Sequence, residues 1–398
     1  MMKQRLKRPL LRLLWSTGAA ASPWLDRPAD LGRVRRILVF QGGGIGDVIR
    51  VFPALRALHQ ALPGTSITSL TQYGANLFRL FPRPEAVTDH VVYDLQGAHR
   101  GLLPKIRLAL ALRRRRFDMI FSPNYGLGMI EAGIFSFLVG APCRIGFDHG
   151  GAGFLYTIKR NLAPTPSIQE QALALLAAAG LPLPCPERYL QVPEDGLVHA
   201  QAILRHAGIP EGCRLVVVAP EVKTDARYGS FPEYRAWPLA HMAVLLREIP
   251  RRLHARVVLL GRPLADSGAL GLEAGAAAAP VVNLLGETTL AEAAGLIGSA
   301  QLFIGNDSGL LHVAVGLQVP SVAIFGATAP HQVIPQSDMC VSLWKGLPCS
   351  PCFSHQPLFD LVCPFGVACL TTITPAEVLE AAERLLARPQ AAAQRPPP

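Results

Sequence analysis

QLFIGNDSGLLHVAVGLQVPSVAIFGATAP, residues 301–330, is the stretch of this sequence that decides the fold. Its first five residues form a short apolar run that predicts a buried strand. A helix is predicted next, because Leu311, Val315 and Val319 recur on one helical face. Pro320 ends that helix, and the apolar run after it predicts a second strand. The stretch is therefore a strand–helix–strand unit.

The turn that joins the first strand to the helix has the features of an anion-binding site. Asp307 and Ser308 stand where an N-cap belongs, and Gly309 lets a ligand approach the backbone closely. The first four N–H groups of a helix have no intrahelical partner, and they form a positive end for a phosphate. We expect Asp307 to order the turn rather than to touch the phosphate with its carboxylate.

Length and composition indicate two domains of ordinary size. The chain has 398 residues, and 50% of them are apolar, which is enough for a sizeable core. It contains no run of 18 apolar residues, so we expect no transmembrane helix. The formal net charge is +10, but residues 1–36 carry nine Lys and Arg against two Asp, a net charge of +7. Because the basic excess lies at the N-terminus, we expect no nucleic-acid binding by the folded body.

A basic N-terminal extension, residues 1–34, precedes the predicted domains. Leucines recur at helical spacing from Leu6 to Leu14 with arginines beside them, which suits a helix on an anionic membrane surface. Pro9 favours the alternative, a frayed basic tail. A signal peptide fits less well, because Arg12 interrupts its apolar region.

The fold begins with a second strand–helix–strand unit. Strands are predicted over 37–40 and 66–70, with a helix over about 48–62 between them. The turn after the first strand reads QGGGIGD, and its glycines are also compatible with a tight turn that holds no ligand. An NAD-binding unit is disfavoured, because Thr71-Gln72 stands where the acidic ribose contact belongs.

Strand-like apolar runs alternate with helical patterns along both halves of the chain. Such alternation predicts parallel, doubly wound α/β sheets that bind ligands at the carboxyl ends of their strands. One of the helices ends in four arginines, which suit either a phosphate ligand or a solvated helix C-terminus. Further strands are predicted at 91–93, 117–121, 144–147, 215–219, 256–260 and 281–283, and helices at 102–116, 129–139, 169–180, 197–207, 238–248 and 290–300.

A group of prolines between 182 and 193 marks the predicted linker. It separates a first Rossmann-like domain, 35–190, from a second one, 195–374. The last segment, 375–398, is predicted to be a helix that crosses back to the first domain, followed by a disordered tail. Two sheets that face each other in this way would form a cleft.

Four of the eight cysteines cluster late in the chain, at Cys349, Cys352, Cys363 and Cys369. Four thiolates at this spacing suit a tetrahedral, structural zinc or iron site. The alternative is a set of reduced thiols in a proline-rich loop. The other cysteines are scattered, so a secreted disulfide scaffold is not indicated.

Three segments in a fixed order carry a resemblance to a known family. They are ILVFQGGGIGDVIRVFPALRAL (37–58), RAWP (235–238) and NDSGLLHVAVGLQVPSVAIFG (306–326). Together they resemble glycosyltransferase family 9, the heptosyltransferases that build the inner core of lipopolysaccharide. The resemblance covers about 35–385 and includes the cysteine-rich segment 349–369.

The resemblance implies a fold, an activity and a location. The fold is GT-B, two Rossmann-like domains facing a cleft, with an ADP-sugar donor held mainly by the second. The activity is inverting transfer of a heptose or a related sugar to a lipopolysaccharide-core or other glycan acceptor. The location is cytoplasmic, with the inner membrane surface as a further partner. Such transfer requires no cofactor, because positive groups stabilise the leaving diphosphate.

Asp47 is the expected general base. It ends the glycine turn and begins a helix, and inverting transfer needs a base that removes the proton of the acceptor hydroxyl. The resemblance gives this role to the aspartate of GxGD, which Asp47 matches, and places Gly44 and Gly46 near the donor. The alternative is that Asp47 only caps its helix.

The resemblance places the donor diphosphate at Ser308, Gly309 and His312. Arg235 stands where the family often has a lysine, and an arginine can bind phosphate as a bidentate fork. Lys223 is a further donor contact on a loop that is longer than the family pattern. His312 is also compatible with a core histidine, and Arg235 with a surface charge. No acidic ribose contact can be assigned, so the donor sugar stays open.

Two other functions remain compatible with these residues. One is a transferase of the same fold that uses another nucleotide-sugar or a protein acceptor. The other is a nucleotide-sugar-binding protein without catalytic activity.

Overall fold

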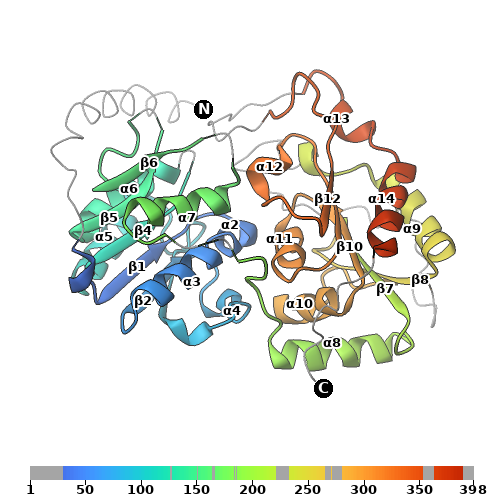
Figure 1. Ribbon diagram of the computed structural model, residues 1–398, viewed down its shortest axis with the longest axis horizontal. Helices are drawn as coiled ribbons and strands as arrows, with labels where there is room; N and C mark the ends of the chain where they lie inside the picture. The colour runs from blue at the N-terminus through green and yellow to red at the C-terminus, as the bar shows by residue number, and fades with distance from the viewer. Residues whose placement is uncertain are drawn as a thin grey trace. The chain divides into compact units, whose positions relative to one another are not determined.

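The computed structural model describes residues 30–125, 128–149, 151–163, 166–182, 184, 186–220, 233–264, 270, 280–352 and 363–388. The chain divides into two compact units between Tyr189 and Leu190 (Figure 1). The helix predicted at 6–14 and the predicted donor contact Lys223 lie outside the described residues. Within the described ranges, no helix is long and apolar enough to cross a membrane.

The first unit is built on one sheet of six parallel strands. The strand order is β3-β2-β1-β4-β5-β6, so the first strand lies in the middle, beside the fourth. The elements in chain order are β1 (Arg36–Phe40), α2 (Ile45–Ile49), α3 (Phe52–Ala61), β2 (Ser66–Thr71), α4 (Ala75–Phe78), β3 (Val87–Val92), α5 (Leu102–Arg113), β4 (Met119–Ser122), α6 (Gly128–Val139), β5 (Cys143–Asp148), β6 (Ile158–Asn161) and α7 (Ile168–Ala178).

Helices cover both faces of this sheet. On one face, Ala109 and Leu112 of α5 and Phe135 of α6 pack on Leu38 and Ile120. On the other face, α3 and α7 lie against each other (Figure 1). A parallel strand covered on both faces must be apolar throughout, which explains the continuous run in β1.

The second unit repeats the arrangement. Its strand order is β12-β11-β10-β7-β8-β9, again fully parallel, with its first strand beside its fourth. The elements are α8 (Glu194–His206), β7 (Arg214–Ala219), α9 (Leu239–Leu253), β8 (Ala255–Leu259), β9 (Val281–Asn283), α10 (Leu290–Ser299), β10 (Leu302–Asn306), α11 (Gly309–Gly316), β11 (Ser321–Ile324), α12 (Pro330–Val333), β12 (Cys340–Leu343), α13 (Ala368–Thr371) and α14 (Pro375–Ala387). Two doubly wound parallel sheets confirm the predicted fold class.

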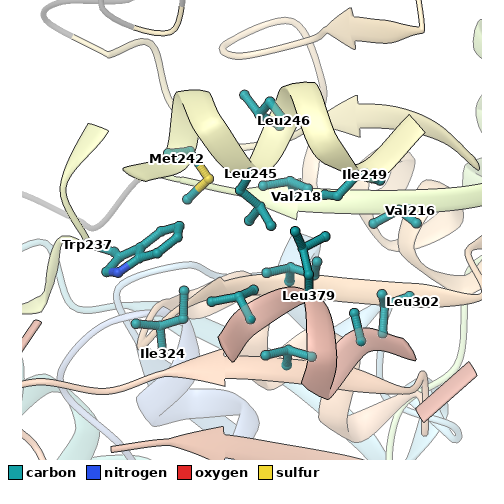
Figure 2. Packing of buried hydrophobic residues seen from close by; sticks show 14 of the residues in the cluster. Val216, Val218, Trp237, Met242, Leu245, Leu246, Ile249, Leu302, Ile324 and Leu379 are labelled. Carbon is teal, nitrogen blue, oxygen red and sulfur yellow. The ribbon is translucent and has the colours of Figure 1, made fainter. Parts of the chain in front are cut away.

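The core of the second unit lies between its sheet and the helices α9 and α14. Figure 2 shows Trp237 and Leu245 facing Val218 and Ile324 of the sheet, with Leu379 of α14 beside them. Trp237 is only 1% exposed, and its indole N–H donates to the carbonyl of Ile373 at 3.0 Å. The tryptophan of the RAWP segment therefore anchors that segment in the core.

The single helix predicted over 48–62 is in fact two helices, α2 and α3. The break follows Arg50, and Pro53 occupies the first turn of α3. A proline has no N–H to offer Ile49, and its ring would clash with that carbonyl if the helix were continuous. The chain therefore turns before Pro53, and α2 stays short enough to present Asp47 beside the glycine turn.

The helix after the anion-binding turn ends earlier than predicted, and Pro320 does not end it. The last residue of α11 is Gly316, and Gln318 adopts a left-handed φ of 60°. The N–H of Val319 then bonds to the carbonyl of Ala314 at 3.0 Å. This is a Schellman arrangement, which satisfies the last carbonyls of the helix. Val319 is buried after the helix rather than on its face.

The final helix was predicted to cross back to the first domain, and that expectation is wrong. Val378, Leu379, Ala382 and Leu385 of α14 are buried in the core of the second unit. The apolar face of α14 covers the second sheet instead.

Two edge strands, β6 and β12, were missed. Their residues are only partly buried, and neither contains the apolar run or the regular alternation that identifies a strand. Pairing with β5 and β11 decides their conformation.

Candidate active site

Each sheet has one switch point, where the winding direction of the chain reverses. It lies between β1 and β4 in the first unit and between β7 and β10 in the second. Ligands of doubly wound sheets bind outside the carboxyl ends of the strands at this point. The two glycine turns identified in the sequence follow β1 and β10, so each stands at a switch point.

At each switch point, the side-chain amide of one asparagine donates to a backbone carbonyl and accepts from a backbone N–H. In the first unit, the Asn124 amide donates to the carbonyl of Phe40 at 2.7 Å and accepts from the N–H of Gly42 at 2.8 Å. In the second unit, Asn306 donates to the carbonyl of Pro220 at 2.7 Å and accepts from the N–H of Trp237 at 3.1 Å. Sequence reasoning gave neither asparagine a role, because their partners lie more than 60 residues away.

A buried hydroxyl network supports Asn124. Its amide also donates to Ser122 Oγ at 2.9 Å, and the Tyr156 hydroxyl donates to the same oxygen at 3.3 Å. Burial raises the pKa of Tyr156, so the phenol stays protonated and remains a donor. The end of β4 is therefore held by a fully hydrogen-bonded set of buried side chains.

Asp47 stands on the short helix α2, at the end of the glycine turn. Gly43 has a φ of +102°, a region that favours glycine, and a Cβ there would lie 2.3 Å from Asp47 Oδ2. The turn therefore folds tightly around the carboxylate, and the N–H of Gly44 donates to Asp47 Oδ2 at 2.6 Å. The N-cap is Gly44, so Asp47 caps the helix from its third position and not from the N-cap position that the alternative role assumed.

Two further side chains hold the other carboxylate oxygen. Arg50 Nη2 and the Tyr125 hydroxyl both donate to Asp47 Oδ1, and they also contact each other. The Arg50 side chain is 8% exposed, whereas that of Asp47 is 24% exposed. The carboxylate thus keeps one open side. The spacing of Asp47 and Arg50 on one helix could have revealed the first contact, but the Tyr125 contact is long-range.

The N-terminus of α11 has no side-chain cap among the described residues of the second unit. Ser308 has N-cap geometry, but its hydroxyl does not bond to the helix. Asp307 turns away from the helix and accepts from the Thr328 hydroxyl at 2.8 Å. Asp307 therefore orders the turn, and no side chain of the described residues caps the first N–H groups of α11.

Arg235 lies beside that turn. Its Nη1 donates to the carbonyl of Asp307 at 3.3 Å and lies 3.8 Å from Asp307 Oδ2. The side chain is 21% exposed, so part of the guanidinium still faces solvent. Because Trp237 is buried and bonded to Asn306, the backbone that carries Arg235 is fixed.

The predicted site residues fall into two groups. Asp47, Gly44 and Gly46 belong to the first unit. Arg235, Asp307, Ser308, Gly309 and His312 belong to the second unit, where all lie at or near the start of α11. His312 is only 4% exposed, one turn into that helix.

The segment with the four late cysteines contacts Tyr234, the residue that precedes Arg235. Cys352 and Cys363 pack on Tyr234 and Ala327, and the N–H of Cys363 donates to the Tyr234 hydroxyl at 3.1 Å. Burial raises the pKa of Cys369 to about 11, and the other three thiols add to the rise. Among the described residues, however, no three potential ligands are arranged as a metal site. The donor set suits zinc or iron, although it is not closed around an ion.

Two Rossmann-type sheets, with a carboxylate at one switch point and a helix N-terminus beside an arginine at the other, match the GT-B class of glycosyltransferases. The model of the family described as glycosyltransferase family 9 (heptosyltransferase) matches residues 105–362, more than half of the chain. The chain belongs to glycosyltransferase family 9.

Individual relatives agree with this assignment. Lipopolysaccharide heptosyltransferase 3 of Escherichia coli is 26% identical over 314 residues, covering 76% of this chain and 86% of the relative. The solved structure of ADP-heptose LPS heptosyltransferase II from E. coli is 24% identical, with a TM-score of 0.64 over 88% of this chain and 98% of that one. The iron-containing dodecameric glycosyltransferase TibC from enterotoxigenic E. coli is 16% identical, with a TM-score of 0.52 over 90% and 77%. These likenesses confirm the predicted GT-B fold.

Proposed function

We propose that this chain transfers a heptose from ADP-heptose to a lipopolysaccharide-core acceptor with inversion at the anomeric carbon. The observation that carries the proposal is the open N-terminus of α11 with Arg235 beside it, in a member of family 9. A similar solved protein is described as an ADP-heptose LPS heptosyltransferase, which supports the donor and the class of acceptor.

The leaving diphosphate is stabilised by the second unit. The free N–H groups of α11 and the dipole of that helix favour an anion at Ser308 and Gly309. Arg235 adds a planar cation that can bind two phosphate oxygens. These positive groups act most strongly when charge develops on the leaving ADP, so they lower the barrier without a metal. His312 and Lys223 are the further donor contacts in this proposal.

Asp47 is the general base of the proposed reaction. It removes the proton of the attacking acceptor hydroxyl as that oxygen bonds to the anomeric carbon and ADP departs. The N–H of Gly44, Arg50 and Tyr125 hold the orientation of the carboxylate. The Asp47 side chain is also 24% exposed, so an acceptor hydroxyl can approach it from solvent. Gly44 and Gly46 are the donor contacts that the proposal assigns to the first unit.

The test is Asp47→Asn, assayed for ADP release from ADP-heptose with a core acceptor and, separately, for ADP binding. The amide keeps an oxygen for the Gly44 N–H, so the fold is expected to survive. Loss of a general base lowers turnover on the order of a hundred- to ten-thousand-fold. Because the donor groups belong to the other unit, ADP affinity should stay unchanged.

Arg235→Gln is the matched comparison. It should weaken ADP binding and leave the folded first unit intact, since Arg235 belongs to the second unit, where it donates to the carbonyl of Asp307. Near-normal turnover in Asp47→Asn would remove Asp47 as the base. A joint loss of folding and ADP binding would assign Asp47 to capping alone.

The cysteine segment belongs to the same proposal as a structural metal site. Cys349, Cys352, Cys363 and Cys369 would bind one zinc or iron as thiolates. A similar solved glycosyltransferase is described as iron-containing, which supports iron as a candidate for the bound metal. The metal would stabilise the segment that packs on Tyr234 and would take no part in the reaction.

A further inference from the structure

The exposed apolar side chains of this protein are concentrated on two neighbouring helices. Nine large apolar side chains are exposed among the described residues, and five of them lie on α5 and α6. Their exposed fractions are 74% for Leu102, 57% for Leu103, 49% for Leu110, 38% for Ile134 and 49% for Phe137. Single exposed apolar residues need no explanation, but a group of this kind marks an interaction site.

The folding of the first unit does not require this exposure. Both helices already bury an inner side, with Ala109 and Leu112 of α5 and Phe135 and Val139 of α6 in the core. Leu103 and Leu110 of α5, and Ile134 and Phe137 of α6, lie on the opposite side, where polar residues would normally stand. Leu102 is exposed because it is the first residue of α5. The outer side of α5 therefore carries large apolar side chains that its packing does not require.

The two helices are joined into one surface. Lys105 of α5 forms an ion pair with Glu131 of α6 at 2.7 Å. Arg113 at the end of α5 donates to the carbonyl of Leu138 at 3.2 Å. We call the outer side of this pair, made of Leu102, Leu103, Arg107, Leu110, Arg114, Ile134 and Phe137, the α5–α6 surface.

The charged side chains of the α5–α6 surface, Arg107 and Arg114, are both basic. Leu103, Arg107, Leu110 and Arg114 follow one another at helical spacing, so leucine and arginine alternate along the exposed side of α5. Neither arginine forms an ion pair within the described ranges. The only acidic side chain on the two helices is Glu131, and Lys105 neutralises it.

We propose that the α5–α6 surface docks on an anionic lipid bilayer. Leucine and phenylalanine side chains enter the boundary between headgroups and acyl chains, while arginines bind anionic headgroups. A second copy of the chain that docked through the same surface would place the arginines against equally basic residues. The inference rests on the proposed function in one respect: an acceptor carried by a lipid requires the enzyme to act at the bilayer.

The apolar half of the surface is tested with the full chain and vesicles of phosphatidylcholine with or without phosphatidylglycerol. Leu103→Gln/Leu110→Gln should reduce sedimentation with the anionic vesicles on the order of tenfold or more. Val198→Gln/Val244→Gln is the matched control, since both valines are exposed on helices of the second unit. The control should bind vesicles like the unmodified chain.

The basic half is tested in the same way. Arg107→Gln/Arg114→Gln should reduce binding on the order of tenfold, and added salt should weaken the binding of the unmodified chain. Arg205→Gln/Arg247→Gln removes two exposed arginines from the second unit and should have no effect. Every variant should keep its ADP affinity and its transfer to a deacylated, water-soluble acceptor.

Three results would overturn the inference. The first is absence of vesicle binding by the unmodified chain, and the second is equal binding by the surface variants, which would assign docking to another segment. The third is self-association of the chain without lipid that Leu103→Gln/Leu110→Gln abolishes, because the surface would then belong to a second copy. Vesicle binding without any heptose transfer would leave the inference standing and contradict the proposed function instead.

Discussion

Asparagine suits the two switch points because its amide group donates and accepts at once. Asn306 donates to the carbonyl of Pro220 and accepts from the N–H of Trp237, and Asn124 does the same with Phe40 and Gly42. An aspartate could not donate, and a leucine would leave two buried backbone groups unpaired. One residue thus joins the ends of two strands and fixes the backbone on which a functional side chain stands.

At the same scale, Arg50 is predicted to position Asp47. Arg50→Gln removes the cation beside the carboxylate and keeps the Tyr125 hydroxyl as a donor to Oδ1. We expect turnover to fall on the order of ten- to a hundredfold with unchanged ADP affinity, and the pH profile of turnover to shift. The measurement is ADP release as a function of pH beside an ADP-binding isotherm.

Arg56→Gln is the control for this prediction, because Arg56 is exposed on the neighbouring helix α3. Arg50→Lys should recover part of the activity, since it restores the charge without the planar fork. An Arg50→Gln variant that lost turnover but kept the original pH profile would indicate a purely structural role.

At the scale of elements, α14 shows how a helix end is fixed by its sequence. Thr374 and Glu377 form a capping box, in which the N–H of Thr374 donates to Glu377 Oε2 at 2.8 Å. Lys345 donates to the other oxygen of the same carboxylate at 2.6 Å, which ties the helix start to the segment after β12. This helix covers the core of the second unit, so its N-terminus contributes to the stability of that unit.

A pH-dependent stability is predicted from that carboxylate. The hydrogen bond from Lys345, followed by that from the Thr374 N–H, lowers the pKa of Glu377 below its ordinary value of 4.5. A lowered pKa stabilises the fold above about pH 4.5, and this stabilisation is lost as the pH falls through the folded-state pKa. Glu377→Gln should therefore reduce the free energy of unfolding by about 0.5 kcal/mol at neutral pH, a small value because the pair is largely solvated.

The measurement is urea unfolding at neutral and at acid pH. The difference between Glu377→Gln and the unmodified chain should vanish in acid. Glu380→Gln changes an exposed carboxylate on the same helix and should show no such difference. An equal loss at both pH values would indicate lost packing instead of lost charge.

At the scale of the whole molecule, the cysteine segment connects distant parts of the second unit. It follows β12 in sequence, yet the backbone N–H of Cys363 donates to the hydroxyl of Tyr234, which directly precedes Arg235. The N–H of Ala327 also bonds to the carbonyl of Tyr234, at 3.2 Å. Whatever orders this segment therefore also orders the turn that carries the proposed phosphate ligand.

Metal removal should accordingly weaken donor binding. Elemental analysis should find about one zinc or iron per chain, and Cys352→Ser should lose it. ADP affinity should fall along with the metal, because Tyr234 loses its support. Cys213→Ser, a free thiol outside the cluster, should change neither value. A metal-free chain that is fully folded and binds ADP normally would contradict the metal site.

The sequence by itself determined the features that depend on neighbouring residues. The apolar runs 37–40 and 302–305 fixed two central strands, because a strand buried on both faces must be apolar throughout. The glycine turn before Asp47 and the turn before Gly309 were recognisable because backbone geometry limits which residues can occupy them. Alternation of strands and helices was enough to predict two parallel sheets.

Only the tertiary structure decided which distant side chains meet. Tyr125 lies 78 residues from Asp47, and Asn306 lies 86 residues from Pro220, so no local pattern relates them. The strand β6 forms because β5 offers it a partner, and α14 packs on the second sheet because its apolar face fits that core. Local sequence fixes backbone conformation within a few residues, whereas contacts between distant residues follow from the order in which the strands assemble into a sheet.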